Sequence, residues 1–206
     1  MVREGYAYGL PLLLIAAALF ALKIYAPAVV FLVIAGLVLN FFRDPNREVP
    51  SDPHALVSPA DGRVVEITEE EHEGRTMRRL SIFMSPLDVH VNRAPISGVI
   101  TKVIYKRGSF RVASRASASV ENEQNFFILQ GEQGTVYVKQ IAGALARRIV
   151  FWKRPGQRLE RGERFGLIKF GSRVDLIAEL TTEWRVKPGD YVKAGSTILG
   201  ITEPRP

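Results

Sequence analysis

The Gly171–Ser172 peptide is the part of this sequence best suited to chemistry. The segment Phe165-Gly-Leu-Ile-Lys-Phe-Gly-Ser-Arg-Val-Asp-Leu-Ile177 places it between two apolar, strand-like runs. A serine hydroxyl can attack the carbonyl carbon of the preceding residue, and a glycine there has no side chain to block the approach. The same pair also serves as an ordinary turn between strands. Taken alone, the bond is either a turn or a site of self-cleavage.

Two further Gly–Ser pairs are weaker candidates. Gly195-Ser196 lies within the turn pattern Val186-Lys-Pro-Gly-Asp-Tyr-Val-Lys-Ala-Gly195, where the backbone itself requires glycine. Gly108-Ser109 follows a basic strand end and has no apolar run after it. Of the three pairs, Gly171-Ser172 is the one that a surrounding core could hold rigidly.

His90 is the histidine best placed to act as a base. It lies in Phe83-Met-Ser-Pro-Leu-Asp-Val-His-Val-Asn-Arg-Ala-Pro95 and alternates with Asp88 and Asn92. This alternation predicts three polar side chains on one face of a strand. Such a polar surface favours a general base, although a lone histidine is also common as a structural residue.

Asp61 supplies a third residue type that such chemistry uses. Within Val57-Ser-Pro-Ala-Asp-Gly62 the local pattern indicates a turn aspartate. Aspartate, histidine and serine from separate segments are nonetheless the parts of an orienting group, a base and a nucleophile. Asp61, His90 and Ser172 are therefore the candidate catalytic residues, and the sequence leaves open whether they meet.

The elements that must position these residues are short strands. Apolar runs alternate with turn signals, and they predict strands at 56–57, 62–68, 78–84, 99–105, 126–130, 135–141, 167–170, 174–180 and 197–202. Residues 142–150 predict either a short helical turn or a further strand. Many short strands at close spacing favour an all-β sandwich or barrel-like body.

The turn pattern of the C-terminal part is similar to that of the barrel-sandwich hybrid in biotinyl and lipoyl carriers. A Pro-Gly-Asp turn is followed by further glycines at Gly195 and Gly200. Those carriers need a lysine at a hairpin tip in a Met-Lys-Met or Asp-Lys-Ala setting, and neither occurs here. The similarity therefore predicts the architecture, a mainly β, barrel-sandwich-hybrid-like body, and not the carrier function.

The N-terminal part is a membrane-associated segment. Residues 9–42 are almost wholly apolar, and Lys23 is their one charge. Lys23 and Pro27 divide this run into stretches of about 13–15 residues, which favours a helical hairpin dipping into the membrane. A single tilted span and a buried soluble hairpin are the alternatives. Arg43 and Arg47 follow the run directly, which suits a cytoplasmic exit.

Composition excludes several functional classes. The chain has 206 residues and no cysteine, so disulfides and thiolate chemistry are excluded. Its three histidines are not grouped at zinc-ligand spacing. The net charge of +7 indicates an anionic partner, and residues 93–164 carry fourteen Lys or Arg against five Asp or Glu. Because no RNP-like aromatic pattern or DNA-reading helix occurs, a membrane surface is favoured over nucleic acid.

Several segments together resemble the short bacterial type of phosphatidylserine decarboxylase. They cover nearly the whole chain in the expected order, and no single one is decisive. The matching segments are Phe41-Phe-Arg-Asp-Pro45, Val57-Ser-Pro-Ala-Asp-Gly62, Phe83-Met-Ser-Pro-Leu-Asp-Val-His-Val-Asn-Arg93, Glu121-Asn-Glu-Gln-Asn125, Ile141-Ala-Gly-Ala-Leu-Ala-Arg-Arg-Ile149 and Phe165-Gly-Leu-Ile-Lys-Phe-Gly-Ser-Arg-Val-Asp175.

The resemblance implies a proenzyme that cuts itself between Gly171 and Ser172. The cut would give a β chain of residues 1–171 and an α chain of residues 172–206, which form a heterodimer. Ser172 would become a pyruvoyl group that forms a Schiff base with phosphatidylserine and takes up electrons as carbon dioxide leaves, yielding phosphatidylethanolamine. No pyridoxal phosphate or metal would then be needed. The corresponding domains are a membrane segment at 1–42, a linker at 43–55 and a catalytic domain at 56–206.

Two segments depart from the pattern of the longer relatives. Asp61 and His90 match the acid and base positions, but Arg93 stands where those relatives carry a second histidine, and Phe170-Gly-Ser-Arg173 replaces Leu-Gly-Ser-Thr. His90 therefore serves self-cleavage and later protonation, or another base starts the cleavage. A non-catalytic, membrane-anchored lipoyl-like adaptor and a decarboxylase of another serine-type anionic lipid remain alternatives, and the sequence leaves a higher oligomer open.

Overall fold

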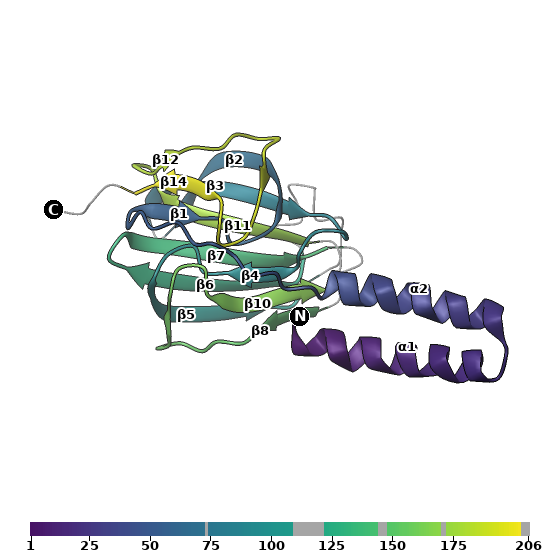
Figure 1. Ribbon diagram of the computed structural model, residues 1–206. Coiled ribbons are helices and arrows are strands. Elements are labelled where there is room, and N and C mark those ends of the chain that lie inside the picture. The colour runs from purple at the N-terminus through teal and green to yellow at the C-terminus, as the bar shows by residue number, and fades with distance from the viewer. Residues whose placement is uncertain (73, 109–121, 144–147, 170–171, 203–206) are drawn as a thin grey trace. The chain divides into compact units, whose positions relative to one another are not determined.

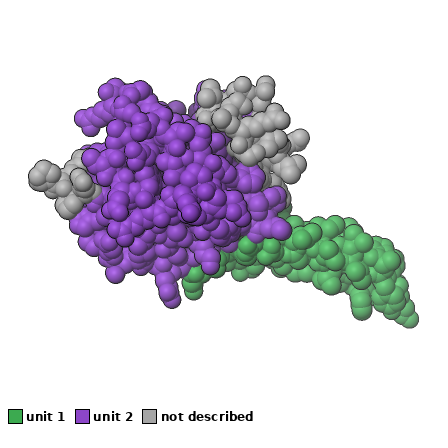
Figure 2. Space-filling model, turned by 90° about the horizontal axis from the view of Figure 1, so that it is seen from above, with its two compact units in different colours: residues 1–46 green, residues 47–206 purple. Residues whose placement is uncertain are grey.

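The computed structural model describes residues 1–72, 74–108, 122–143, 148–169 and 172–202 (Figure 1). The chain divides into two compact units, residues 1–46 and residues 47–206, which Figure 2 colours separately. The boundary falls within the proline-rich segment expected to be a linker. The helices belong to the first unit, and the strands belong to the second.

The first unit is a helical hairpin, as predicted. Helix α1 (Arg3–Ala21) and helix α2 (Tyr25–Phe41) are joined at Lys23, which adopts a left-handed conformation with φ of 60°. Pro27 lies in the first turn of α2, where a missing backbone N–H is tolerated. The helices have 19 and 17 residues, so the predicted length of 13–15 was wrong. Because the chain reverses at Lys23, a single continuous span is wrong as well.

Small residues lie between the two helices, and large apolar residues face outward. An added Cβ at Gly9 would lie 2.4 Å from Leu39 Cδ2, so close packing of the helices requires glycine there. The outward residues include Leu14, Phe20 and Leu37, each at least 60% exposed. Helix α1 has the length and hydropathy of a helix that could cross a membrane, and α2 is a shorter apolar helix.

The second unit is the predicted β body. Its largest described sheet is a curled half-barrel with eight strands in the order β13-β2-β3-β11-β7-β6-β5-β9 (Figure 1). Two three-stranded sheets, β1-β14-β12 and β4-β10-β8, accompany it. The strands are β1 Ala55–Val57, β2 Gly62–His72, β3 Arg75–Met84, β4 Val91–Arg93, β5 Gly98–Lys106, β6 Gln124–Gly131, β7 Gly134–Ala142, β8 Arg148–Phe151, β9 Arg158–Leu159, β10 Arg164–Lys169, β11 Ser172–Glu179, β12 Glu183–Trp184, β13 Tyr191–Val192 and β14 Ile198–Ile201.

Each of the nine predicted strands overlaps an observed one. The ambiguous segment 142–150 ends in strand β8, and residues 144–147 lie outside the described part of the chain. The main core is shared by all three sheets; it includes Leu56, Ile82, Phe127, Phe165, Ile168, Leu176 and Leu199. The strands that the sequence did not predict, β4, β9, β12 and β13, have only two or three residues each.

Strand β11 lies near the middle of the large sheet. It pairs antiparallel with β3 on one side and with β7 on the other. Because side chains alternate along a strand, Ser172, Val174 and Leu176 share the face that packs into the main core. Arg173 and Asp175 project from the opposite face. This register buries the hydroxyl of Ser172 within the body.

The second half of the expected linker is bound to the β body by Arg161. The guanidinium of Arg161 donates to the carbonyl oxygens of Pro50 at 2.7 Å, Asp52 at 2.5 Å and Ala55 at 3.0 Å. Burial of backbone carbonyls away from their usual partners is costly, and a single guanidinium satisfies several of them here. This stretch is therefore a fixed strap on the β body.

The start of β2 requires glycine. A Cβ added at Gly62 would lie 2.1 Å from the carbonyl oxygen of Phe83, and Gly62 has φ of 150°. We expect Gly62→Ala to lower the free energy of unfolding by about 3 kcal/mol, because steric displacement of β3 adds to backbone strain. Urea unfolding in detergent measures this. At Gly156 (φ 85°) a Cβ meets open space, so Gly156→Ala should cost only about 1 kcal/mol; equal losses would contradict the account.

Candidate active site

Ser172 is the first residue of β11 and is fully buried. It pairs with Met84 on β3 and with Ala142 on β7, and its exposed fraction is 0%. The Ser172 Oγ donates to the sulfur of Met84 at 3.4 Å. A thioether is a weak acceptor, so this contact holds the hydroxyl in place without taking its proton. Gly171, the predicted carbonyl side of the scissile bond, lies outside the described residues.

His90 lies just before β4, beside the strand that leads toward Ser172. The backbone carbonyl of His90 accepts a hydrogen bond from the Ile168 N–H at 3.4 Å, near the end of β10. Its Nδ1 lies 2.8 Å from the carbonyl oxygen of Asp88. Because a carbonyl oxygen only accepts, the Nδ1 of neutral His90 carries the proton and Nε2 holds the lone pair. The geometry therefore makes Nε2 the basic nitrogen.

The predicted alternation of Asp88, His90 and Asn92 along one strand was wrong. Asp88 lies in a turn, and only Asn92 belongs to β4. The Asp88 carboxylate accepts hydrogen bonds from the Ser85 N–H at 2.7 Å and the Tyr191 hydroxyl at 2.6 Å. Asp88 thus fixes the turn with its side chain and orients His90 with its backbone carbonyl.

Asp61 lies at the same end of the large sheet as Ser172. It directly precedes β2, whose Arg63 pairs with Phe83 of β3, and Phe83 pairs in turn with Arg173 of β11. One carboxylate oxygen of Asp61 accepts from Arg47 Nη2 at 2.7 Å, and the other accepts from the Ala194 N–H at 2.8 Å. The orienting group on His90 Nδ1 is therefore the Asp88 carbonyl and not the Asp61 carboxylate.

Burial dominates the electrostatics of Asp61. It raises the pKa of this carboxyl above its ordinary value, while the Ala194 N–H and the Arg47 guanidinium act in the opposite direction. Arg47 lies in the first half of the expected linker, so the charge of Asp61 depends on the position of that segment.

Sequence reasoning missed a chain of buried amides that ends beside Ser172. Asn125 Nδ2 donates to Gln140 Oε1 at 3.0 Å, and Gln140 Nε2 donates to Asn92 Oδ1 at 2.9 Å. Asn92 Nδ2 then faces the sulfur of Met84 at 3.8 Å, the same sulfur that Ser172 contacts. The three amides come from β6, β7 and β4, so no local pattern reveals them.

A second asparagine of the 121–125 segment braces the strand next to Ser172. Asn122 Nδ2 donates to the carbonyl oxygen of Ala142 at 2.7 Å, and the Ala142 N–H donates to the Glu123 carbonyl at 2.9 Å. Ala142 is the residue that pairs with Ser172. Asn122 and Glu123 therefore fix the end of β7 against the start of β11.

The structure explains how an arginine is accommodated at position 173. It is almost fully buried on the far face of β11, where its Nε donates to Asp175 at 2.5 Å and its Nη2 to the Ser81 hydroxyl at 2.6 Å. Glu66 lies 3.4 Å from the same Nη2. Buried charges of this kind persist only when they are paired and hydrogen-bonded. Arg173 and its partners thus anchor the start of β11 from the side opposite to the Ser172 hydroxyl.

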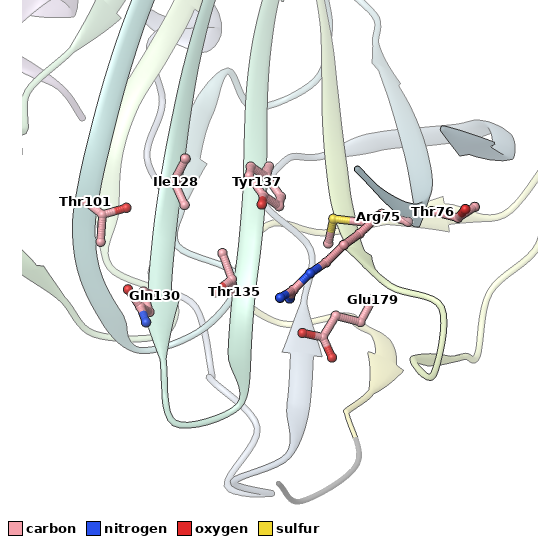
Figure 3. A pocket seen from close by; sticks show the side chains of 9 residues that line it. Arg75, Thr76, Thr101, Ile128, Gln130, Thr135, Tyr137 and Glu179 are labelled. Carbon is pink, nitrogen blue, oxygen red and sulfur yellow. The ribbon is translucent and has the colours of Figure 1, made fainter. Parts of the chain in front are cut away.

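The cavity of about 530 Å³ shown in Figure 3 is lined by residues other than these. Its lining includes Tyr137, Arg75 and Glu179. Glu179 is at the opposite end of β11 from Ser172. Among the described residues, no three His, Asp or Glu side chains gather as a metal site. The candidate active site is therefore the enclosed region around Ser172.

The comparisons identify the family. The sequence model of phosphatidylserine decarboxylase matches residues 34–200. The chain is 50% identical over 199 residues to the phosphatidylserine decarboxylase proenzyme of Solibacter usitatus, covering 97% of this chain and 95% of the relative. It is 51% identical to the Salinibacter ruber proenzyme (82% and 78% covered) and 41% identical to that of Burkholderia ambifaria (98% and 96%). The chain belongs to the phosphatidylserine decarboxylase family.

Arg47 should control how stability depends on pH. Because the folded-state pKa of Asp61 is raised, stability falls as pH rises from about 4 through that pKa. Arg47→Met removes a guanidinium that lowers the pKa of Asp61. That pKa therefore rises further, and stability falls by a larger amount as pH rises. We expect a loss of about 3 kcal/mol at neutral pH, from an uncompensated buried charge, and a smaller loss near about pH 4.

Urea unfolding at the two pH values measures this difference. Arg154→Met is the matched control, because Arg154 is exposed and remote from Asp61 in the sequence. Equal losses for Arg47→Met at both pH values would rule out the link to Asp61.

Proposed function

We propose that this chain is a self-processing, pyruvoyl-dependent phosphatidylserine decarboxylase that converts phosphatidylserine to phosphatidylethanolamine in phospholipid biosynthesis. The observation that carries the proposal is the fully buried Ser172 hydroxyl at the start of β11. The basic Nε2 of His90, on the segment beside β10, supports it. The names of the relatives, which are proenzymes, agree with a chain that must be processed.

Self-cleavage proceeds in three steps. The Ser172 Oγ attacks the Gly171 carbonyl carbon, the C–N bond breaks, and the hydroxyl proton passes to the freed amine, which leaves an ester. A base then removes the Ser172 α-proton, the Cβ–Oγ bond breaks, and Gly171 leaves as a carboxylate. The remaining dehydroalanine takes up water and releases ammonia, which gives a pyruvoyl end at position 172. His90 is the proposed base, because its backbone carbonyl accepts from Ile168, four residues before Ser172.

The surroundings of Ser172 suit such a group. A pyruvoyl end supplies an amine-binding ketone and an electron sink for decarboxylation. The chain's own residues supply the rest: Met84 excludes water from one side, and the amide of Asn92 is a donor beside the same sulfur. Both carboxylate oxygens of Asp61 are bound, one by Arg47 and the other by the Ala194 N–H.

The two products of cleavage should stay together. Strand β11 of the proposed α chain, residues 172–206, is hydrogen-bonded to β3 and β7 of the proposed β chain, residues 1–171. Strand β14 pairs with β1 of the β chain as well. Separating the chains would break these ladders and open the core, so a tight heterodimer follows.

The hairpin is the proposed membrane anchor. Its outward side chains are large and apolar, and helices of 19 and 17 residues are close to the thickness of the hydrocarbon layer. Both open ends of the hairpin lie at one end, because the Val2 N–H donates to the Phe42 carbonyl. Arg3 and Arg43 therefore lie at that same end, which favours the cytoplasmic side for the proposed catalytic domain, residues 56–206.

Removal of the nucleophile tests self-cleavage. Ser172→Ala should leave the chain intact, because the attacking oxygen is gone. Denaturing gel electrophoresis shows one species or two. Ser196→Ala makes the same change at the Gly195–Ser196 pair, and this variant should still be cut. Cleavage of Ser172→Ala at the wild-type site would contradict the proposed mechanism.

The role of His90 is tested by His90→Asn. The asparagine amide can still donate to the Asp88 carbonyl, but it lacks the basic Nε2. We expect self-cleavage or carbon dioxide release to slow by about 100-fold or more. The control His54→Asn changes a histidine outside the site. Wild-type rates for both reactions in His90→Asn would return His90 to a structural role.

A further inference from the structure

The chain of buried amides has a fixed direction. Asn125, Gln140 and Asn92 are each at most 2% exposed. Gln140 and Asn92 each use the carboxamide oxygen to accept from the preceding amide, so the NH₂ group of each points away from that amide. An inverted carboxamide would set two oxygens or two NH₂ groups against each other. The orientation of the Asn125 carboxamide therefore sets the orientation of the Asn92 carboxamide.

The last donor in this chain faces a poor acceptor. Asn92 Nδ2 points at the sulfur of Met84 at 3.8 Å, and a thioether accepts hydrogen bonds only weakly. A buried amide donor gains much more from a charged oxygen in the same place. Ser172 Oγ contacts the same sulfur, at 3.4 Å. The fold thus holds an amide donor and the nucleophile against the same sulfur atom.

We propose that Asn92 Nδ2 is the donor that stabilises the oxyanion formed when Ser172 attacks the preceding carbonyl, and that Gln140 and Asn125 are positioning residues that hold Asn92 in this orientation. This inference rests on the proposed self-cleavage. As the Oγ–C bond forms, the carbonyl electron pair moves to oxygen, and it returns when the C–N bond breaks. Asn92 gains and loses nothing; it lowers the energy of the charged intermediate.

Gly166 shows that the fold makes room for this arrangement. A Cβ at Gly166 would lie 3.2 Å from Gln140 Nε2 and 2.3 Å from the Val150 carbonyl oxygen. Gly166 pairs with Asn92 across β10 and β4. The strand opposite Asn92 therefore lacks a side chain where the Gln140–Asn92 hydrogen bond passes.

The substitution Gln140→Glu tests the direction of the chain without changing an atom at Ser172. When protonated, the introduced carboxyl can accept from Asn125 and donate to Asn92 Oδ1, which keeps the wild-type direction. When ionised, it can only accept, so Asn92 turns its NH₂ group toward it and presents its oxygen to Met84 and Ser172. Burial between neutral amides raises the pKa of the new carboxyl above that of an exposed glutamate.

The measurement is the rate of self-cleavage of freshly synthesised full-length chain. Cell-free translation with detergent is followed by a chase at about pH 5 and about pH 8, on either side of the expected ionisation. At each pH the rate is divided by that of wild type, which removes any pH dependence that the two chains share. We expect a ratio within about tenfold of 1 at the lower pH and about 100-fold below 1 at the higher pH.

A control variant and the pH dependence of the rate together separate the proposed role of Asn92 from general damage to the protein. Gln124→Glu places the same carboxyl one residue from Asn125 on β6, outside the amide chain, and its ratio should stay near 1 at both pH values. A misfolded Gln140→Glu chain would be slow at both pH values, whereas the inference requires recovery at the lower one. Ratios that do not change with pH, whether near 1 or low, overturn the role of Asn92.

The experiment distinguishes failure of the proposed function from failure of the proposed role of Asn92. If wild-type chain is never cut, the proposed function fails. If wild type is cut and Gln140→Glu follows it at both pH values, self-cleavage stands and only the oxyanion donor is rejected.

Discussion

The pairing of β11 with a strand on each side is the constraint on which the rest of the structure depends. Hydrogen bonds to β3 and β7 fix the register of Ser172 against Met84 and Ala142. Because side chains alternate, that register sends the Ser172 hydroxyl into the core and the Arg173 guanidinium to the other face. A slip by one residue would exchange the two, burying a charge in the apolar core and removing the nucleophile.

Polar groups support the start of β11 from both faces of the strand. Burying these groups costs free energy, and only complete hydrogen bonding offsets that cost. On the core face, the Asn125–Gln140–Asn92 chain satisfies each buried amide in turn. On the other face, Asp175 and Ser81 bind Arg173. Since an unsatisfied buried polar group is costly, such networks have one low-energy arrangement. That uniqueness suits a reaction that requires one peptide bond to be held in one geometry.

The sequence predicted what is periodic and local, and it missed what is short or distant. Long strands such as β3 and β7 were predictable because alternation is visible over many residues, whereas β4 has three residues and shows none. The turn at Asp88 was misread as strand although Ser85-Pro86 is a turn signal. Gln140 and Asn92 are 48 positions apart, so only the folded sheets show that they meet.

The mass of the small chain tests the central claim most directly. If Ser172 becomes a pyruvoyl group, denaturing mass spectrometry of the purified protein gives a chain of residues 172–206 that is lighter by one ammonia than the serine-ended peptide. Conversion of Ser172 to a pyruvoyl group predicts that mass and an amine-free end. A single intact chain of 206 residues, or a fragment that begins with an unmodified serine, would contradict it.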